Sequence, residues 1–433
     1  MRNDILSADF TTQPYWTDGL APFAEIPPPS ARHVEVAVIG GGFAGLSAAL
    51  TLARAGRGVT VFEATTIGSG AAARAAGSLG HVPKASLSEL EALYGRSAAL
   101  AAYTEAREAK EFVADLIREY QIACGLKVVN RFIAAHSPRA FERQRKSLPS
   151  LQATMGAVEL VSREHQRDQV GSDAFFGGIR IAGAATLQPA LLQRGIATAA
   201  QAAGASIRQN TPVTDVRQNG ARFEIETPGG SFSADHVLLA INAEVRFGPR
   251  RFRDLARRLV VIPAYGLATE EVEPEMMSRV LPIGGPVSDT YKIINYIAPS
   301  DNGRRFIISG RAGRSEGGLE QKAERMFGYF AERFPDLRGI KVSHCWAGRF
   351  AVTSDWVPHM GLDEGVHYVL GCCGTGIPMS TWLGHRVALK IMKQDDKNSA
   401  FDRPLPAMSF TAARNALLPL MVRAYALRDR LFR

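Results

Sequence analysis

Apolar positions near the start of the chain follow two different spacings, which predict a strand, a turn, a helix and a second strand. Residues 34–39 (VEVAVI) are rich in β-branched residues, which favour a strand. Beyond a run of glycines, apolar residues recur at three- and four-residue spacing, as on one face of a helix: Leu46, Ala49, Leu50 and Ala53. Residues 59–62 (VTVF) form the second predicted strand.

The stretch from Val36 to Ala53 carries no charged residue and just reaches the length of a membrane-spanning helix. The glycines at 40–42 argue against such a helix, because each costs about 1 kcal/mol in a helix interior. We therefore predict a β-α-β unit rather than a membrane span.

Similar patterns predict further elements. Helices are predicted over 87–122, with a break near Gly95, and over 189–203, with Pro189 in the first turn. Short strands are predicted within 204–242, with turns at Asn219-Gly220 and Gly229-Gly230, and again over 261–269, 291–297 and 305–309. A glycine-rich return to the core is predicted over 367–392.

The early glycines acquire a chemical meaning because they link a strand to a helix. The spacing Gly40-x-Gly42-x-x-Gly45, followed by an acid at Glu63 after the second strand, is typical of dinucleotide binding. Gly40 allows a sharp turn, Gly42 lets backbone N–H groups approach a pyrophosphate, and Gly45 lets the helix pack close to the strand. The helix N-terminus attracts phosphate, and Glu63 would accept hydrogen bonds from a ribose. The sequence therefore predicts a nucleotide site.

Composition excludes other classes of protein. The chain has 433 residues, 46% of them hydrophobic and 21% charged, as in a globular enzyme. The net charge of +9 is dispersed, and its densest cluster, 249–258, contains only one aromatic residue, so we predict no nucleic-acid partner. The four cysteines form no CxxC pair and the nine histidines show no ligand spacing, so no metal is expected. The charged first residues lack an apolar signal sequence, which predicts a cytoplasmic protein.

Beyond the dinucleotide motif, five stretches follow in a set order: ATTIGSGAAARAAGSLG, ATLQPALLQRGIATAAQAAGASIRQNTPVTDV, DHVLLAIN, CWAGRFAVTSDWVPHMG and GCCGTGIPMSTWLG. Together they resemble the FAD-dependent D-amino acid oxidase superfamily over residues 15–433. The pattern is most similar to gamma-glutamylputrescine oxidase, with glycine oxidase and sarcosine oxidase as further members. The resemblance implies an α/β fold, in which a Rossmann-like FAD-binding domain is interleaved with an α+β substrate domain built on a mainly antiparallel sheet.

The implied domains alternate along the chain. The FAD-binding domain is predicted over 34–125, 186–254 and 345–398, and the substrate domain over 126–185 and 255–344. A lead-in over 1–33 and a basic tail over 399–433 complete the chain.

The resemblance assigns FAD to the nucleotide site and implies which residues hold it. The segment from Gly68 to Ser78 would wrap the ribityl chain and the isoalloxazine ring. The backbone at Val213 would meet the adenine, and N–H groups of the loop at 374–376 would face the flavin pyrimidine edge. The implied cofactor-binding residues are Gly40, Gly42, Phe43, Ala44, Gly45, Glu63, Ala64, Gly70, Ala71, Arg74, Gly77, Ser78, Val213, Gly348, Gly374, Thr375, Gly376 and Ile377.

Two departures from the gamma-glutamylputrescine oxidase pattern change what this site can do. Where that pattern has GASGRNGG, residues 70–77 read GAAARAAG, which removes side-chain hydrogen bonds to the flavin. Where it has GHG, this chain has Gly374-Thr375-Gly376. We therefore expect a different substrate specificity.

Several residues are candidates for the substrate site. Lys292 lies near the oxygen-activating lysine of sarcosine oxidase, with a surface lysine as the alternative. Arg349 lies one position from the arginine that binds the substrate carboxylate in glycine oxidase, with a structural arginine as the alternative. Tyr265 and Tyr296 either line the pocket or pack in the core. Cys345 lies where sarcosine oxidase attaches its flavin, but we expect a plain buried cysteine without a covalent link.

The family's chemistry implies oxidation of the C–N bond of a small amine or amino acid by hydride transfer to flavin N5, with oxygen as the expected acceptor. A strong general base is not required, because a neutral amine already activates the C–H bond. Two alternatives stay open: a dehydrogenase that passes electrons to a quinone or carrier, and a flavin-binding protein without catalysis. The basic C-terminal stretch NALLPLMVRAYALRDRLFR either packs on the enzyme or makes a peripheral membrane contact.

Overall fold

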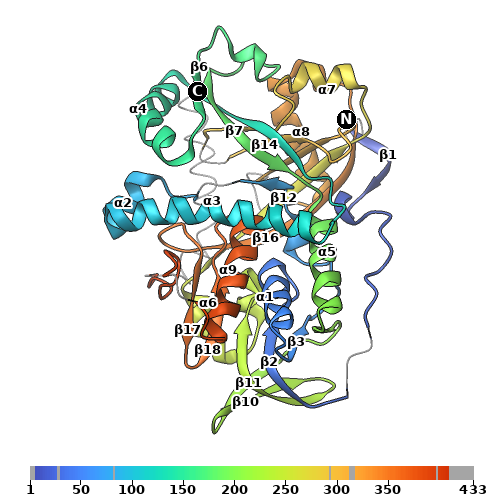
Figure 1. Ribbon diagram of the computed structural model, residues 1–433. Coiled ribbons are helices and arrows are strands. Elements are labelled where there is room, and N and C mark those ends of the chain that lie inside the picture. The colour runs from blue at the N-terminus through green and yellow to red at the C-terminus, as the bar shows by residue number, and fades with distance from the viewer. Residues whose placement is uncertain are drawn as a thin grey trace.

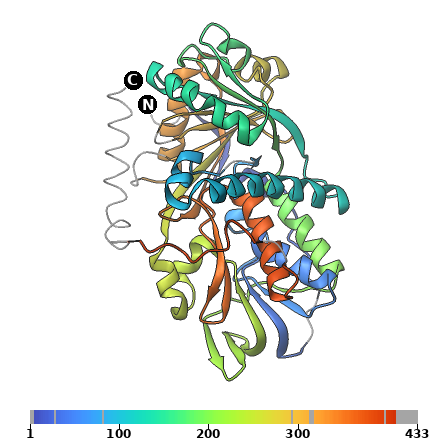
Figure 2. The same cartoon turned by 60° about the vertical axis from the view of Figure 1, so that its left-hand side comes forward.

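Two β-sheets, one above the other, organise the fold (Figure 1). The computed structural model describes residues 5–26, 30–80, 83–291, 294–311, 317–395 and 398–408. The long helix α3 (Arg96–Glu119) runs between the two halves, which Figure 2 shows from a second direction. Lys292 and the basic C-terminal stretch lie outside the described residues.

The lower sheet has eight strands, and its central strands are parallel. Its main path is β17 (His359–Asp363), β18 (Val366–Leu370), β11 (Gly230–Leu239), β2 (His33–Ile39), β3 (Val59–Phe62) and β8 (Ser206–Arg208), with β10 (Arg222–Thr227) and β9 (Asp215–Asn219) extending from β11. One face packs against α1 (Phe43–Arg54), α5 (Pro189–Ala202) and α9 (Gly376–Ile391). The other face packs against α6 (Arg253–Arg257) and the side chains of the β9–β10 hairpin.

The upper sheet has ten strands and is mainly antiparallel, as the fold class predicts. Its main path is β1 (Leu6–Thr11), β16 (Val342–Val352), β12 (Val260–Thr269), β15 (Phe306–Gly310), β14 (Tyr296–Pro299), β13 (Val287–Asp289), β5 (Lys127–Ala134), β7 (Gly178–Thr186) and β4 (Ser78–Leu79), with β6 (Val158–Val161) paired to β7. One face packs in an apolar core with α7 (Pro274–Val280) and α8 (Leu319–Arg333). The helix α4 (Pro138–Met155) lies beside β6 and β7 (Figure 1).

The predicted β-α-β unit is confirmed. Strands β2 and β3 are parallel, with Val36 opposite Val59, and α1 connects them. Almost every residue of the uncharged stretch is buried in the protein, and among the described residues no helix is long and apolar enough to span a bilayer. The domain boundaries remain predictions, although β16 crosses the one predicted between 344 and 345 and stays within a single sheet.

The two predicted helical regions are confirmed in detail. The break near Gly95 separates α2 (Leu87–Tyr94) from α3, and Gly95 has a φ of +82°, which favours glycine. Helix α5 begins at Pro189, where the missing N–H costs nothing, and the side chain of Gln188 accepts a hydrogen bond from the Leu191 N–H at 2.7 Å.

The strand predicted over 291–297 is wrong in its first half. The structure has β13 ending at Asp289 and β14 beginning at Tyr296, and Tyr291, Ile294 and Asn295 belong to neither strand. The buried Asp289 carboxylate accepts hydrogen bonds from the backbone N–H of Tyr291 and Asn295, each at 3.2 Å. A local acid that binds nearby backbone N–H groups overrides the strand preference of the neighbouring apolar residues.

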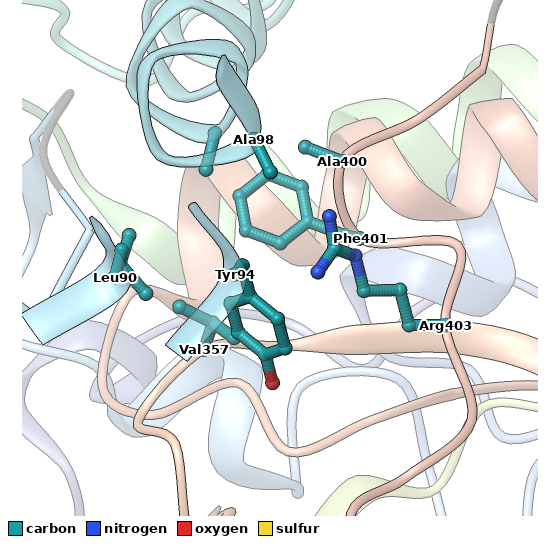
Figure 3. A pocket seen from close by; sticks show the side chains of 8 residues that line it. Leu90, Tyr94, Ala98, Val357, Ala400, Phe401 and Arg403 are labelled. Carbon is teal, nitrogen blue, oxygen red and sulfur yellow. The ribbon is translucent and has the colours of Figure 1, made fainter. Parts of the chain in front are cut away.

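The segment 398–408 fastens the end of the described chain to α2 and α3. The buried Glu105 of α3 accepts hydrogen bonds from the Ser399 hydroxyl at 2.6 Å and the Ala400 N–H at 2.7 Å. Figure 3 shows Phe401 and Arg403 beside Tyr94, around a cavity of about 10 Å³. A cavity of this size holds one water molecule at most, so it is no substrate site.

A buried cluster joins the same region to the lower sheet. The Asp355 carboxylate accepts hydrogen bonds from the Tyr94 hydroxyl and from His359 Nε2, the latter at 2.9 Å. His359 Nδ1 lies 3.2 Å from the carbonyl oxygen of Arg403. Burial raises the pKa of Asp355, but the hydrogen bond and charge of His359 outweigh it and lower this pKa to about 2.

This lowered pKa predicts an acid-sensitive contribution to stability. Because the folded-state pKa lies below the unfolded value of about 3.9, the stabilisation is present above pH 4 and is lost as the pH falls towards 2. We expect Asp355→Asn to lower the free energy of unfolding by about 1–2 kcal/mol at pH 7 and by much less at pH 2.5. Urea titrations at both pH values measure this, with Asp254→Asn, in an exposed ion pair with Arg257, as the matched control. An equal loss at both pH values would contradict the prediction.

Candidate functional site

Four neighbouring parallel strands end at one edge of the lower sheet. Strands β18, β11, β2 and β3 are adjacent, and their carboxyl ends lead into loops that begin at Gly371, Ala240, Gly40 and Glu63. Ligands of open parallel sheets bind in the crevice outside such strand ends. Motifs that lie far apart in the sequence therefore meet at a single edge.

The glycines of the first loop serve three different purposes. Gly40 has a φ of +106°, and a Cβ on it would lie 2.8 Å from the Ala240 carbonyl oxygen. A Cβ on Gly45 would lie only 1.9 Å from the Gly40 carbonyl oxygen, so a side chain there would force α1 away from the loop. A Cβ on Gly42 would meet no neighbouring atom of the described residues within 4 Å. This open cradle, bordered by the first N–H groups of α1, fits a pyrophosphate.

Two side chains hold the glycine loop in place. Glu63 Oε2 accepts a hydrogen bond from the Gly41 N–H at 2.8 Å, while Oε1 accepts from the N–H and hydroxyl of Thr65, both at 3.0 Å. The buried Gln193 of α5 donates from Nε2 to the Gly41 carbonyl oxygen at 2.7 Å. The sequence singled out Glu63 for the ribose and did not foresee its contact with the loop. It missed Gln193 altogether, because a glutamine on an amphipathic helix gives no signal of its partner.

The segment 68–78 is held by two buried tryptophans. Trp16 donates its indole N–H to the Ala75 carbonyl oxygen at 2.8 Å, and Trp346 donates to that of Arg74 at 3.1 Å. The Arg74 guanidinium donates to the carbonyl oxygens of Ser69 at 3.0 Å and Ala347 at 2.8 Å. Burial and the nearby charge of Arg349 both lower the pKa of Arg74. The segment is therefore fixed to the upper sheet through β16.

The glycine-rich loop after β18 is held by a residue that the sequence analysis did not single out. Asn242, at the end of the DHVLLAIN stretch, has a φ of +44° and accepts hydrogen bonds from the N–H groups of Gly371 at 3.0 Å and Cys372 at 3.2 Å. Helix α9 starts directly after this loop, so its N-terminus also points to the sheet edge. A Cβ on Gly384 of α9 would lie 2.1 Å from the Ala44 carbonyl oxygen, which shows how closely α9 packs on α1.

The remaining implied cofactor residues lie on the same loops or near them. Phe43 and Ala44 are buried in the first turn of α1, Ala64 is exposed after β3, and Ile377 is buried at the start of α9. Ala71 lies with Arg74 in a short 3₁₀ helix, and Gly70 precedes it. Gly77 and Ser78 lead into β4, Val213 packs beside the lower sheet, and Gly348 of β16 lies beside Arg74. Gly374 and Thr375 precede α9, and Gly376 is its first residue. Their contacts with FAD remain predictions.

The predicted tyrosines lie on opposite faces of the upper sheet. Tyr265 of β12 packs with the apolar core under α8, and the ammonium of Lys322 lies 5.3 Å from its ring centroid. Tyr296 of β14 shares the register line of Ser309 and Gly266, which places it on the other face with Trp346. Only Tyr296 therefore faces the side of the sheet on which the flavin segment lies.

Two other sequence candidates point away from that face. Arg349 is about half exposed and pairs with Glu244 at 3.0 Å, so an ion pair already holds its guanidinium. Cys345 is fully buried on the α8 side, where its thiol contacts the Leu319 carbonyl oxygen at 3.3 Å and burial raises its pKa to about 12. This environment agrees with a plain buried cysteine. Within the described parts of the chain, no group of three acidic, histidine or cysteine side chains could hold a metal ion.

Sequence reasoning missed a charged residue on the face that carries Tyr296. Arg131 of β5 alternates with Phe132, which enters the apolar core, so Arg131 points to the opposite side. Its Nη2 donates to the Ser288 hydroxyl at 3.1 Å, but its buried Nε finds no hydrogen-bond partner among the described residues. Burial lowers the pKa of Arg131. The available signal was an arginine within the mostly apolar stretch VVNRFIAA (128–135), because arginine is rare in a buried strand.

The different surroundings of Gly42 and Gly45 predict different effects of the same substitution. We expect Gly42→Ala to leave the free energy of unfolding of the apoprotein within about 0.5 kcal/mol and to weaken FAD binding at least about tenfold, because only the ligand space is reduced. We expect Gly45→Ala to destabilise the apoprotein by about 1–3 kcal/mol, because the methyl group meets backbone. Urea unfolding and flavin fluorescence titration measure the two effects. Equal apoprotein stability of the two variants would refute this difference.

Comparison with known proteins agrees with this geometry. A family model described as FAD dependent oxidoreductase (DAO) matches residues 35–389. The probable oxidoreductase OrdL of Rhizobium meliloti (strain 1021) is 28% identical over 423 residues, which cover 96% of this chain and 97% of the relative. The gamma-glutamylputrescine oxidoreductase of Escherichia coli (strain K12) is 27% identical over 404 residues, which cover 92% of this chain and 93% of the relative.

The fold of this chain is also similar to a solved structure. The crystal structure of glycine oxidase from Geobacillus kaustophilus superposes with a TM-score of 0.70 at 24% sequence identity, covering 88% of this chain and 99% of that one. The two-sheet arrangement is therefore shared. Because the family model spans most of the sequence, this protein belongs to the FAD dependent oxidoreductase (DAO) family, and FAD is its cofactor.

Proposed function

We propose that this protein oxidises the C–N bond of a small amine or amino acid and that oxygen is the electron acceptor. The observation that carries the proposal is that the segment 68–78, which we call the flavin segment, is hydrogen-bonded to one face of the upper sheet. Trp346 and Arg74 make this connection through hydrogen bonds, and Tyr296 lies on the same face. A substrate bound on this face would lie next to the segment that the family uses for the flavin ring.

The names of two relatives support an amine substrate. One relative, from Escherichia coli (strain K12), is a gamma-glutamylputrescine oxidoreductase, and another, from Bacillus subtilis (strain 168), is a glycine oxidase, 26% identical over 383 residues. Both names refer to compounds that carry an amine. The absence of a histidine from Gly374-Thr375-Gly376 supports a specificity of its own for this chain.

When bound, FAD supplies the hydride acceptor. The chain supplies orientation and electrostatics. The turn before α9 and the N-terminus of that helix present N–H groups and the positive end of a dipole, which favour negative charge at the pyrimidine edge of the ring. Asn242 fixes that turn, and Arg74 adds a positive charge near the ring segment. These fixed dipoles cost no reorganisation during the reaction.

Oxygen as acceptor rests on the family resemblance, and Lys292 is the residue proposed to assist it. A dehydrogenase that passes electrons to a quinone or carrier is the alternative. A membrane contact by the basic C-terminal stretch belongs to that alternative and is also a proposal. Oxygen uptake separates the two, because an oxidase consumes oxygen and releases peroxide during turnover while a dehydrogenase requires an added acceptor.

The first test is the visible spectrum of the purified holoenzyme under anaerobic conditions. We expect the flavin band near ~450 nm to bleach on addition of one compound from a panel of gamma-glutamylputrescine, sarcosine, glycine and D-amino acids, because substrate oxidation reduces the flavin. Readmitted oxygen should restore the band with release of hydrogen peroxide. Free FAD with each compound is the control for non-enzymatic reduction. A band that no amine or amino acid bleaches would refute the proposed function.

A further inference from the structure

We propose that Arg131 and Tyr296 bind a carboxylate group of the substrate, so that the substrate is an amino acid or another amine that carries a carboxylate. This inference rests on the proposed function and narrows its substrate class. It assigns the carboxylate contact to β5 and β14, and not to Arg349 on β16.

Arg131 carries a charge that no carboxylate of the described residues neutralises. Its Nη2 donates to the Ser288 hydroxyl, and its buried Nε has no hydrogen-bond partner in the part of the chain that the structure describes. Among the described residues, no carboxylate lies within ion-pair distance of Arg131. Arg131 as a whole residue is only partly buried. A desolvated arginine that lacks an acid costs free energy, which an incoming anion recovers.

Tyr296 supplies a second unused donor beside this arginine. Tyr296 is 8% exposed, and its buried hydroxyl makes no hydrogen bond of regular geometry with the described residues. Ser288, which accepts a hydrogen bond from Arg131, is the cross-strand partner of Tyr296, so the two groups lie close together. Burial raises the pKa of Tyr296 to about 12. At neutral pH the phenol is protonated and can donate. Arginine and tyrosine thus offer N–H and O–H donors to one ligand.

The strand register places the two donors on one face. Ser288 of β13 pairs with Tyr296 of β14 on one side and with Ile133 of β5 on the other. Because side chains alternate along a strand, Ser288, Tyr296 and Arg131 all point to the same side, while Phe132 and Ile297 enter the apolar core under α8. Ser288 lies between the two donors and holds the guanidinium.

The same face adjoins the flavin segment. Strand β4, in which Ser78 ends that segment, pairs with β7, and β7 pairs with β5, the strand of Arg131. Trp346, whose indole holds Arg74, shares this face across β12, where Gly266 leaves room for its ring. A carboxylate on Arg131 and Tyr296 would therefore hold the rest of a small amino acid close to the segment that the family uses for the flavin ring.

The chemistry of the donors selects a carboxylate. The planar guanidinium presents Nε and Nη donors in a fork that matches the two oxygens of a carboxylate. An amine without an anionic group would leave both Arg131 Nε and the Tyr296 hydroxyl unpaired, which costs affinity. Arg349 is less suited, because it is about half exposed and pairs with Glu244.

Acetate is the probe for this subsite, because it has the carboxylate and no oxidisable amine. We expect acetate to perturb the visible flavin spectrum of the holoenzyme and to raise its thermal midpoint. Arg131→Met should weaken acetate binding by at least about tenfold, and Tyr296→Phe by about fivefold, through loss of charge-assisted and neutral hydrogen bonds respectively. Arg180→Met is the matched control, since Arg180 lies on the adjacent strand and pairs with Glu159 at the surface.

Arg131→Lys keeps the positive charge but lacks the planar pair of guanidinium N–H donors. It therefore tests the subsite if Arg131→Met does not fold. We expect this variant to bind acetate about fivefold more weakly than the wild-type protein. Substrate preference gives an independent readout, because Arg131→Met should lose activity on amino acids relative to the corresponding decarboxylated amines.

Two results would overturn the inference. One is acetate binding that is absent from the wild-type holoenzyme or unchanged in both Arg131 variants. The other is reduction of the wild-type flavin by amines without a carboxylate and by no amino acid. If no amine or amino acid reduces the flavin, the proposed function fails, whereas the acetate titration still decides whether the carboxylate subsite exists.

Discussion

The close approach of backbone to backbone around helix α1 is the constraint on which the site depends. At its start, Gly45 packs against the Gly40 carbonyl oxygen, and on its outer side Gly384 of α9 packs against that of Ala44. A single methyl group at either glycine would lie 1.9 or 2.1 Å from an oxygen, well inside van der Waals contact. Because α1 cannot shift, its N-terminal N–H groups stay aimed into the crevice at the strand ends. The same contact fixes α9 and the return loop beside them.

The alanine-rich segment between β3 and β4 shows how the structure compensates for missing side-chain polarity. Residues 70–77 have only one side chain, that of Arg74, with strong hydrogen-bonding capacity. The backbone of this segment is instead held by the indoles of Trp16, near the N-terminus, and Trp346, in β16. Small side chains let these large rings approach the segment closely.

Charge is distributed unevenly between the two sides of the upper sheet. The face beside the flavin segment carries Arg74 and Arg131, and burial lowers the pKa of both. The α8 side instead holds Asp289, whose pKa burial raises to about 6 while Tyr329 and Asn295 donate hydrogen bonds to it. The two arginines make the face beside the flavin segment cationic, which suits an anionic ligand. On the α8 side, the single buried carboxylate of Asp289 also accepts hydrogen bonds from the backbone N–H groups of Tyr291 and Asn295.

The sequence alone determined the β-α-β unit and the dinucleotide site, because both depend on local spacing, whereas the fold class followed from the resemblance of several motifs to one family. Glycines at Gly40, Gly42 and Gly45, the helix break at Gly95 and the helix start at Pro189 each depend on neighbours within a few residues. Local spacing also misled, since it began a strand at Tyr291, whose backbone N–H instead donates to the Asp289 carboxylate.

Only the tertiary structure decided which side chains share a face and which residues hold the loops. Gln193 and Asn242 were missed because each contacts backbone that is distant in sequence. Tyr265 and Tyr296 are equivalent tyrosines in apolar strands until the register puts them on opposite faces. The role of Arg131 depends on Ser288 of β13, which lies 157 residues away in the chain, and on β14, which pairs with β13 and not with β5. Side-chain direction in a sheet depends on register, and register is a property of the assembled sheet.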